Sequence, residues 1–442
     1  MTPPASGSVS IFRAGWVIPI VGMPIRGGEV LVIQGRIAAV GRKLGRAVPG
    51  VCGRCPVYDF EDSALLPGFV NPHTHLELSD INAPIPVEVT GFSGWINRVI
   101  LHRRTRSLSP GKVTSCGISE SLRYGVVAFG DITQPGMGPS IYRGIKLDES
   151  GATTFVPSGV AFLELIGPTK DRARLALEQA REHVKHSWPR GLRPGLAPHA
   201  PYTVRRELLR KIVALSRERH LPVAYHLAES TEEKQLLECG KGPLRELLEA
   251  RRAWSPGEVK GRNFLGELKL LAEAQRVLVI HGNYLDDGAL TFLAKHRHMF
   301  LVFCPRTYCW FSHETSIAEK AIRLGVQLVV GTDSRASSPS LSMLEELRVA
   351  ARIMPRISPQ KILRMGTIEA ARALGCQRRL GSLQSGKVAH LVAVRMPAAD
   401  RGDLLERILL EDLVVHEVVL HGVVAGRAVI HGEPPDVSLP GH

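Results

Sequence analysis

Histidines and one aspartate end several apolar runs of this sequence, and their side chains could do chemistry together. His73 and His75 stand in PGFVNPHTHLE, at the end of the first such run. Because successive strand side chains point to opposite faces, the i, i+2 spacing puts both imidazoles on one face. Glu229 follows His226 after three residues, in HLAE. The polar residues that end later apolar runs are His199, His226, His281 and Asp333.

The types of these residues favour a metal site. A single histidine at the end of an apolar run is usually a hydrogen-bonded core residue. A buried imidazole or carboxylate costs free energy unless it is paired or metal-bound, so a whole set at strand ends favours one shared partner. Three imidazoles and a carboxylate form a nitrogen and oxygen donor set that suits zinc or iron(II), with a position left for water. The sequence therefore predicts a divalent metal ion, with zinc as the first expectation and iron(II) as the alternative.

The elements that must position these residues alternate between strand and helix patterns. The run before His73 and seven later runs are typical of parallel strands: GVVAFGDIT, TTFVPSGVAFLE, PGLAPHA, LPVAYHLAES, RVLVIHGN, MFLVFCPR and VQLVVGTDS. Helical patterns separate several of them, at residues 171–188, 205–220, 288–298 and 316–325. This alternation predicts an α/β fold, a (β/α)8 TIM barrel, whose chemistry takes place at the C-terminal ends of its strands.

Both ends of the chain carry a different pattern. Residues 9–66 alternate short β-like runs with turn signals, and the same pattern returns after residue 380. Two β-rich ends around a different middle predict one small β-sandwich domain formed by both termini. The predicted boundaries are 1–66 for its N-terminal part, 67–380 for the metal-dependent barrel and 381–442 for its C-terminal part.

The composition limits the class of protein. Of 442 residues, 44% are hydrophobic, which is enough for a large core. We expect a soluble protein without a secretory leader, since no apolar run reaches the roughly 18 residues of a membrane helix. The seven cysteines are scattered and odd in number, which favours reduced thiols in a cytoplasm. Cys52 and Cys55 form a CxxC without a second pair at zinc-ribbon spacing, so a turn between strands is the simpler interpretation.

The net charge of +14 and the pI near 9.7 would suit nucleic acid or an anionic substrate. The basic residues, however, are spread along the chain. Their densest cluster, at residues 102–106, has no aromatic residues beside it on which bases could stack. We therefore expect a solvated basic surface and no nucleic-acid partner.

Five motifs in order, PGFVNPHTHLE, APHAPYT, HLAES, VIHGN and GTDS, resemble the amidohydrolase superfamily. The branch in question is the mononuclear one, which includes cytosine, guanine and S-adenosylhomocysteine deaminases and the triazine chlorohydrolases. The resemblance covers nearly the whole chain, because those enzymes also join a barrel to a β-sandwich built from both termini.

This resemblance implies roles for individual residues. It implies His73 and His75 as the first ligand pair, His226 as the third ligand and Asp333 as the fourth. The catalytic residues that it implies are Glu229 as proton-shuttling carboxylate, His281 as the histidine that positions water or polarises the substrate, and Asp333. Binuclear members carry a modified lysine at the end of the fourth strand, where this chain has Ala197-Pro198-His199. We therefore expect one metal ion, and a substrate contact from His199.

The residues after the first strand bear on the substrate. Trp95 resembles an aromatic position that lies against the substrate in adenosine-type deaminases, and packing of an amphipathic helix is the alternative interpretation. Those enzymes place a ribose-binding glutamate a little further on, where this chain has Arg103, Arg104 and Arg106. Guanidinium groups suit carboxylates, which favours a nucleoside that carries one.

A second resemblance lies at the seventh strand. CPRTYCWFSH, residues 304–313, is similar to an element of the aminodeoxyfutalosine deaminases of menaquinone biosynthesis, whose substrate is an adenosine derivative with a benzoate. It implies that Arg306 and His313 bind substrate, with ordinary loop structure as the alternative.

Together these observations predict an enzyme, a hydrolase of carbon–nitrogen bonds other than peptide bonds. It would release ammonia from an adenine-type nucleoside, with 6-aminodeoxyfutalosine as the first candidate. The alternatives on the same scaffold are a chlorohydrolase, a ring-opening amidohydrolase, or a deaminase of S-adenosylhomocysteine, guanine or cytosine. A non-catalytic barrel is disfavoured because every expected ligand is present, and a serine hydrolase because no GxSxG motif occurs. The expected partner is a small molecule, without a membrane, and self-association is left open.

Overall fold

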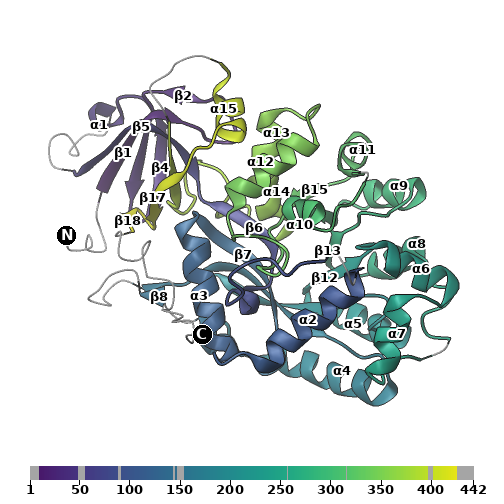
Figure 1. Cartoon of the computed structure of the whole chain (residues 1–442). Coiled ribbons are helices and arrows are strands. Elements are labelled where there is room, and N and C mark those ends of the chain that lie inside the picture. The colour runs from purple at the N-terminus through teal and green to yellow at the C-terminus, as the bar shows by residue number, and fades with distance from the viewer. Residues whose placement is uncertain are drawn as a thin grey trace, which may run out of the picture.

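Figure 1 shows the computed structural model of the chain, which describes residues 9–47, 55–87, 91–142, 145–146, 154–255, 257–314, 316–396 and 402–425. A barrel of strands and helices makes up most of the molecule, and a β-domain lies at one side of it. The first strands of the chain, in purple, and the last, in yellow, meet in this β-domain.

Eight parallel strands form the barrel in the spatial order β15-β14-β13-β12-β11-β10-β7-β6. A parallel bridge between Thr74 and Asp333 joins the two ends of this order and nearly closes the sheet. Helices cover the outside, so most strand residues are buried on both faces, which explains the unbroken apolar runs. The predicted (β/α)8 barrel is confirmed. Its strands are β6 (Phe69–Thr74), β7 (Val126–Thr133), β10 (Ser158–Leu165), β11 (Leu192–Pro198), β12 (Pro222–Leu227), β13 (Arg276–His281), β14 (Met299–Phe303) and β15 (Leu328–Val330).

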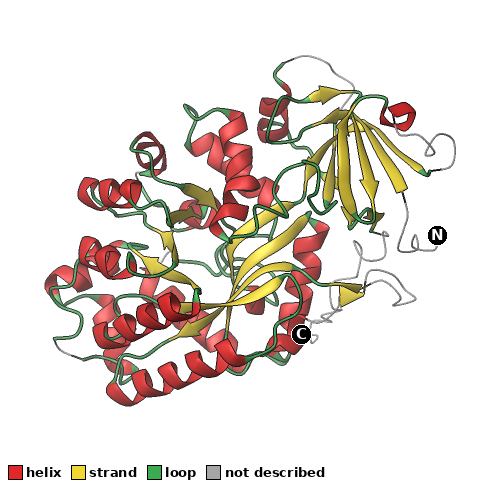
Figure 2. Cartoon of the chain, turned by 180° about the vertical axis from the view of Figure 1, so that it is seen from behind, coloured by secondary structure: helices red, strands yellow, loops and turns green. Residues whose placement is uncertain are grey.

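The helices form an outer layer around these strands, shown in red in Figure 2. Their sequences are amphipathic; α5, for example, buries Leu208, Leu209, Ile212 and Val213 at helical spacing. The helices of the barrel are η1 (Leu76–Leu78), α2 (Gly91–Thr105), α3 (Pro110–Arg123), η2 (Pro139–Tyr142), α4 (Lys170–Lys185), α5 (Arg206–Arg219), α6 (Thr231–Cys239), α7 (Pro243–Ala250), α8 (Phe264–Leu271), α9 (Asp287–Lys295), α10 (Pro305–Trp310), α11 (Ala318–Arg323), α12 (Met343–Ile353), α13 (Pro359–Met365) and α14 (Ile368–Ala373). A short pair, β8 (Ile145–Lys146) and β9 (Thr154–Phe155), lies between β7 and β10 in the sequence.

The β-domain is one mixed sheet built from both ends of the chain, as predicted. In it β1 pairs antiparallel with β3 and parallel with β5, and β5 pairs antiparallel with β16 from the C-terminal part. The predicted boundaries at residues 66 and 380 stay a prediction. Its elements are β1 (Val9–Val17), β2 (Ile25–Arg26), β3 (Glu29–Ile33), β4 (Arg36–Gly41), α1 (Leu44–Ala47), β5 (Val57–Pro67), β16 (Leu391–Arg395), α15 (Leu404–Leu410), β17 (Val415–Leu420) and β18 (Val423–Val424).

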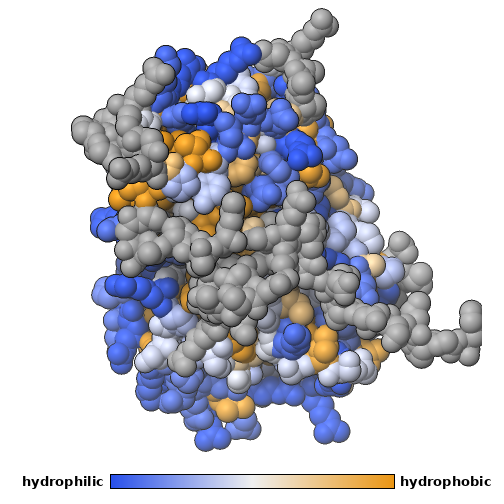
Figure 3. All heavy atoms as spheres, turned by 90° about the vertical axis from the view of Figure 1, so that its left-hand side faces the viewer, coloured by the Kyte–Doolittle hydropathy of each residue, from blue (hydrophilic) through white to orange (hydrophobic). Residues whose placement is uncertain are grey.

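Three further features of the described structure are the polarity of its surface, the character of its helices and the state of its cysteines. Outside the grey atoms, Figure 3 shows a largely hydrophilic face on the side of the β-domain, with small separate apolar patches. Among the described helices, none has the length and apolar character that would be needed to cross a bilayer. Cys55 is a free thiol, and Cys52 lies outside the described residues, so the role of the CxxC stays a prediction.

Candidate active site

The C-terminal ends of the barrel strands bring a cluster of imidazoles and one carboxylate together. His73 is the second-last residue of β6 and His75 follows the strand, while His226 and His281 come from β12 and β13. The Nε2 atoms of His73 and His75 each lie 3.6 Å from Oδ1 of Asp333. The ring centroid of His73 lies 5.0 Å from those of His75 and His226. Residues separated by up to 260 positions therefore face one point above the barrel axis.

The donor atoms of this cluster fit a divalent cation. Two overlapping groups have potential ligand atoms within 4.8 Å of one another: His73, His75 and His226, and His73, His281 and Asp333. Both ring nitrogens of His73 and Nδ1 of His75 are buried without a hydrogen-bond partner, which costs free energy unless a further group binds there. Burial lowers the pKa of His75 and His281 to about 3, so the imidazoles are neutral, as a metal requires.

A hydrogen-bond network locks the first strand of the barrel to the last and so places the ligands. Oδ1 of Asn71 accepts the backbone N–H groups of His73 (3.3 Å) and Thr332 (3.2 Å), and its Nδ2 donates to Oγ1 of Thr332 (2.7 Å). The Thr74 hydroxyl donates to the carbonyl of Asp333 (3.0 Å), whose N–H donates to the carbonyl of His73 (3.2 Å). The two ligand-bearing strand ends are thus tied through the backbone.

Two of the site residues adopt a left-handed backbone. His281 has φ of 68° and Asp333 has φ of 57°, a conformation uncommon outside glycine, although Asp and His adopt it more readily than most. Such a conformation costs about 1–3 kcal/mol and persists where the surrounding structure enforces it, often at functional sites. Its occurrence directly at two strand ends marks this edge of the barrel as a site rather than ordinary core.

Hydrogen bonds with neighbouring residues outside the cluster hold His226 and Glu229 in place. Nδ1 of His226 bonds to the carbonyl of His199 at 3.2 Å. A carbonyl only accepts, so Nδ1 carries the hydrogen and Nε2 is left with its lone pair for the cluster. The N–H of Glu229 donates to the carboxylate of Glu233 (2.8 Å), and Nδ2 of Asn283 donates to the Glu229 carbonyl (3.1 Å).

The pKa values of Glu229 and Asp333 shift in opposite directions in the same site. Burial, together with the charge of Asp333, raises the pKa of Glu229 well above its usual value. Burial would also raise the pKa of Asp333, but the neighbouring imidazoles, first His73 at 3.6 Å and then His281, outweigh it and hold that pKa well below its usual value. His281 lies between them, with Nε2 at 3.4 Å from Glu229 and 4.0 Å from Asp333. Two carboxyl groups in one site whose pKa values are pushed apart are the pattern of acid and base chemistry.

A cavity of about 260 Å³ opens over this cluster. Its polar lining includes His75, His226, Glu229, His281 and Asp333, and its apolar wall comes mainly from α2 and α7. Trp95 lines this wall, while its Nε1 donates to the carbonyl of Ala336 at 3.1 Å. His199 also lines the cavity, and its Nδ1 bonds to the Thr203 hydroxyl at 2.8 Å. Both side chains thus line a cavity, and the predicted substrate contacts of Trp95 and His199 stay predictions.

Comparison with known proteins agrees with this geometry. Residues 64–429 match the model of the amidohydrolase family. The chain belongs to this family. A deaminase of 5-methylthioadenosine and S-adenosylhomocysteine from Thermodesulfovibrio yellowstonii is 29% identical over 390 residues, 84% of this chain and 81% of that protein. An aminodeoxyfutalosine deaminase from Deinococcus radiodurans is 28% identical over 364 residues, 79% of this chain and 81% of that protein.

A solved structure shares the fold of this amidohydrolase. The crystal structure of an adenosine deaminase from Xanthomonas campestris with bound zinc has a TM-score of 0.71 and 23% identity, over 95% of this chain and 93% of that one. The family and the curated relatives show that the protein is a hydrolase of carbon–nitrogen bonds, and the relatives are adenosine-type deaminases.

Arg306 does not reach the cavity of this amidohydrolase. Its Nε donates to Oε1 of Glu346 at 2.7 Å, and its Nη1 donates to the Ser340 hydroxyl at 2.9 Å. Glu346 is fully buried and takes the backbone N–H of Arg306 as well. The guanidinium thus holds α10 against the start of α12, and the predicted substrate contact of Arg306 stays a prediction that these bonds disfavour. His313 also lies outside the cavity lining, with its Nδ1 2.8 Å from the Tyr284 hydroxyl, and its substrate contact stays a prediction.

Arg306→Ala is expected to destabilise the fold without changing the Michaelis constant of the substrate. The substitution would leave the Glu346 carboxyl buried and unpaired, which costs about 3–5 kcal/mol. Chemical unfolding would measure the loss of stability, and steady-state kinetics below the melting temperature would measure KM. A KM raised about tenfold or more, with stability unchanged, would instead return Arg306 to the substrate site.

Two arginines expected at the substrate are also held by the protein itself. Nε and Nη2 of Arg103 lie 2.8 and 2.6 Å from Oε1 of Glu77, and Nη1 of Arg106 lies 2.9 Å from its Oε2. Glu77 is 1% exposed, so one buried carboxylate takes both guanidinium groups. The carboxylate-binding role expected for Arg103 and Arg106 is therefore satisfied internally, although Arg103 still lines the cavity.

The cavity also contains residues that the sequence reasoning missed. Glu164, on β10, lines it and occupies the strand-end position that was used to find the histidines. The strand-end rule could therefore have found it. Arg172 and Arg251 line the outer part, and they come from the start of α4 and the end of α7, where no local pattern distinguishes them from other surface arginines.

Proposed function

We propose that the protein is a metal-dependent deaminase that releases ammonia from an adenine-type nucleoside with an anionic group far from the base. The candidate of greatest interest is 6-aminodeoxyfutalosine, which would place the enzyme in menaquinone biosynthesis. One observation supports an anionic group on the substrate. A second cavity, of about 450 Å³, is lined mainly by arginines and shares Arg172 and Arg251 with the cavity over the metal cluster.

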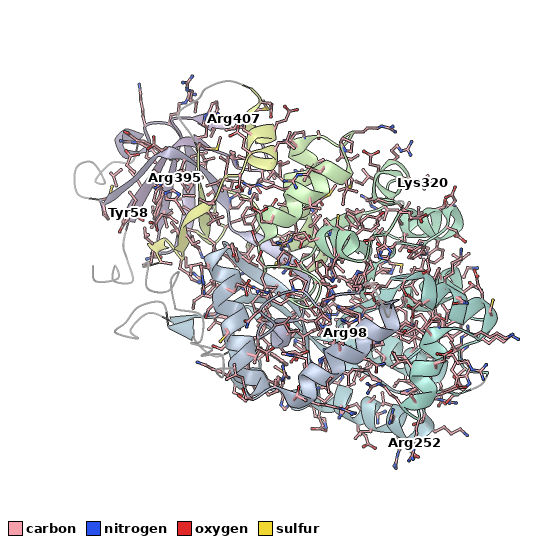
Figure 4. All side chains as sticks on the ribbon, in the orientation of Figure 1. Tyr58, Arg98, Arg252, Lys320, Arg395 and Arg407 are labelled. Atoms are coloured by element: carbon pink, nitrogen blue, oxygen red, sulfur yellow. The ribbon has the colours of Figure 1, made fainter. Side chains whose placement is uncertain are left out.

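The arginines of this outer cavity lack a carboxylate partner among the residues that the structure describes. Within the described part of the chain, none of Arg104, Arg172, Arg251 and Arg252 forms an ion pair with a carboxylate. Nη2 of Arg251 donates to Oδ1 of Asn97, and burial and the neighbouring charge of Arg104 lower the pKa of Arg251. Figure 4 shows Arg252 at the lower edge of the barrel. Crowded guanidinium groups favour a bound carboxylate or phosphate.

A nucleoside would fit these features with its base inside and its anionic end outside. The apolar wall of Phe92, Trp95 and Val99 suits the face of a purine, and Glu229 and His281 lie at the inner end of the cavity. The exocyclic amine would then lie at the metal cluster and the anion among the arginines. The names of the curated relatives, all adenosine-type deaminases, support the same class of substrate.

The proposed ligands of the metal are His73, His75, His226 and Asp333, and zinc is the proposed ion. A bound divalent ion would supply a Lewis acid that lowers the pKa of a water molecule towards neutrality. Asp333, which is ionised, would accept a proton from this water. Glu229, which holds a proton on its carboxyl, would donate it to the ring nitrogen beside the carbon under attack. His281 would keep the water and the amine aligned.

The protons then balance the reaction. A carbon–oxygen bond forms between the ring carbon and the water oxygen, and the carbon–nitrogen bond to the exocyclic amine breaks. The proton held by Asp333 passes to the departing amine, and the ring carbonyl forms as Glu229 recovers its proton from the new hydroxyl. The products are the oxo nucleoside and ammonia. Such positioned acids and bases contribute about 10²–10⁴-fold to the rate.

The test is ammonia release by the purified protein, with its metal content measured, across a panel of compounds. The panel contains adenosine, S-adenosylhomocysteine, 5-methylthioadenosine and 6-aminodeoxyfutalosine, and a chlorinated triazine whose chloride release is followed. We expect 6-aminodeoxyfutalosine to have the highest kcat/KM. If uncharged adenosine or 5-methylthioadenosine had the highest kcat/KM, this would contradict the proposal that the substrate carries an anionic group. Chloride without ammonia would favour the chlorohydrolase alternative.

Arg172→Ala and Arg251→Ala are each expected to raise KM for the anionic nucleoside about 10- to 100-fold, because each loses a hydrogen bond to a charged group. KM for adenosine should change little, and kcat for both the anionic nucleoside and adenosine should stay at the wild-type value. Steady-state kinetics at low and high salt would measure this, with the difference between variants shrinking as salt screens the charge. Arg210→Ala, an exposed arginine of α5 away from the cavity, is the matched control. Equal effects on adenosine and the anionic nucleoside would contradict the role of these arginines.

A further inference from the structure

Glu164 is a buried carboxylate in the cavity that neither the metal cluster nor the proton transfers use. It lies on β10 opposite Ala197 of β11, two residues before His199, and is 3% exposed. Its side chain lines the cavity together with those of His75 and His199. An acidic residue in this position needs partners, because burial of a charge without them is strongly unfavourable.

The protein satisfies only part of this carboxylate. Nε2 of Gln134 donates to Oε2 at 2.8 Å, and Nη1 of Arg103 lies 4.0 Å from the same oxygen. No described residue donates a hydrogen bond to Oε1. Arg103 itself is shared with Glu77, which also holds Arg106, so this group of two guanidinium and two carboxylate groups has no net charge. Glu164 is therefore held as an anion, but with acceptor capacity left over.

The electrostatic surroundings agree with an ionised Glu164. Burial opposes ionisation, but the charges of Arg103 and of nearby His199 outweigh it, so that the pKa of Glu164 falls to about 2. An ionised carboxylate accepts hydrogen bonds and donates none. A ligand group that meets it must therefore bring O–H or N–H donors, and cannot be the anionic end of the molecule.

Glu164 also has a definite place along the cavity. The lining around it includes His75, one of the proposed metal ligands, and His199. Arg103 lies 4.0 Å from its carboxylate, and the same cavity is lined by Arg172 and Arg251, which also line the outer cavity. A ligand with its base at the metal and its anion at the outer arginines would pass Glu164 with its middle portion.

We propose that Glu164 recognises the vicinal hydroxyls of the substrate's sugar. This assignment rests on the proposed function, since it takes the substrate to be a nucleoside with its base at the metal cluster. The middle portion of a nucleoside is a ribose, whose 2′ and 3′ hydroxyls are two adjacent donors that match the two oxygens of one carboxylate. Glu164 makes no contribution to the chemical step in this role. It is a specificity-determining residue that distinguishes ribosides from deoxyribosides.

The test combines changes in the enzyme with changes in the substrate. Wild-type, Glu164→Gln and Glu164→Ala proteins are compared on adenosine, 2′-deoxyadenosine, 3′-deoxyadenosine and 2′,3′-dideoxyadenosine. We expect wild-type kcat/KM to be about 10- to 100-fold higher for adenosine than for the dideoxy compound, and Glu164→Ala to lose this preference. The alanine variant should then change kcat/KM for the dideoxy compound by less than about threefold, because the two changes remove the same contact.

Glu229→Gln provides the contrasting variant, because loss of a proton-transferring group should slow all four substrates by the same factor. A wild-type enzyme that deaminates adenosine and dideoxyadenosine equally would overturn the sugar assignment without any variant and leave the proposed function standing. So would a Glu164→Ala variant that loses the same factor on every substrate. If the wild type released no ammonia from any nucleoside, the proposed function and this assignment would both be overturned.

Discussion

Glu229→Gln is expected to lower kcat for ammonia release by about 10²–10⁴-fold while metal content and melting temperature stay near those of the wild type. The amide has the shape of the carboxyl but can neither donate a proton to the ring nitrogen nor take one back from the new hydroxyl. Oε1 of Glu229 lies 3.4 Å from Nε2 of His281, and burial and the charge of Asp333 raise the pKa of this carboxyl, which favours its role as a proton donor. The backbone contacts of Glu229 with Glu233 and Asn283 are unaffected by the change.

The measurement is steady-state ammonia release together with metal analysis and thermal melting. Glu238→Gln, on the exposed side of α6, is the matched control and should behave as wild type. A Glu229→Gln variant that keeps more than about a tenth of the wild-type kcat would show that another group moves the proton. Loss of metal in the same variant would instead make Glu229 part of the metal site.

His226→Ala is expected to remove both bound metal and activity. It deletes one of the three imidazoles whose nitrogens lie within 4.8 Å of one another. Loss of a group that merely orients a ligand weakens metal binding about 10- to 100-fold, and loss of a ligand should exceed that range. The melting temperature should fall as well, since an ion that binds only the native state stabilises it. Metal analysis after gel filtration and calorimetric melting would measure both effects.

His199→Ala is the matched control for this variant, because His199 is a histidine of the same cavity that belongs to neither metal-binding group. It should keep the metal and change mainly KM. Removal of the metal from wild-type protein by a chelator should also abolish ammonia release, and zinc or iron(II) should restore it. Full activity of the metal-free protein, or normal metal content in His226→Ala, would contradict the proposed ligand set.

Much of the barrel could be predicted from the chain because its strands are buried on both faces. Such strands read as continuous apolar runs, for example RVLVIH and MFLVF, and few other elements of similar length have this pattern. The carboxyl ends of parallel strands must meet at one edge, so the side chains there had to converge. For this reason the clustering of His73, His75, His226, His281 and Asp333 followed from their positions in the sequence.

Arg306 shows the limit of the same reasoning. Like the histidines, it follows a barrel strand, but it is the second residue of α10 and its guanidinium turns to Glu346 on α12. A strand-end position states which edge of the barrel a residue lies on, but not which of several neighbours its long side chain reaches. Arg103 and Arg106 illustrate the same limit, since Glu77, 26 to 29 residues earlier, takes both.

The proposed metal ligands and the residues at the substrate end of the site are thus brought into place in different ways. Short, stiff imidazoles that directly follow buried strands are placed by the strand itself, and strand positions can be read from the alternation of apolar runs. The arginines of the outer cavity come from α2, α4 and the end of α7, and they share a space only because these helices pack at one mouth of the barrel. Long flexible side chains on separate helices become neighbours through packing and charge pairing, which depend on the whole fold. The proposed metal ligands could therefore be predicted from the sequence, whereas the proposed anion site and the proposed role of Glu164 depend on the tertiary structure.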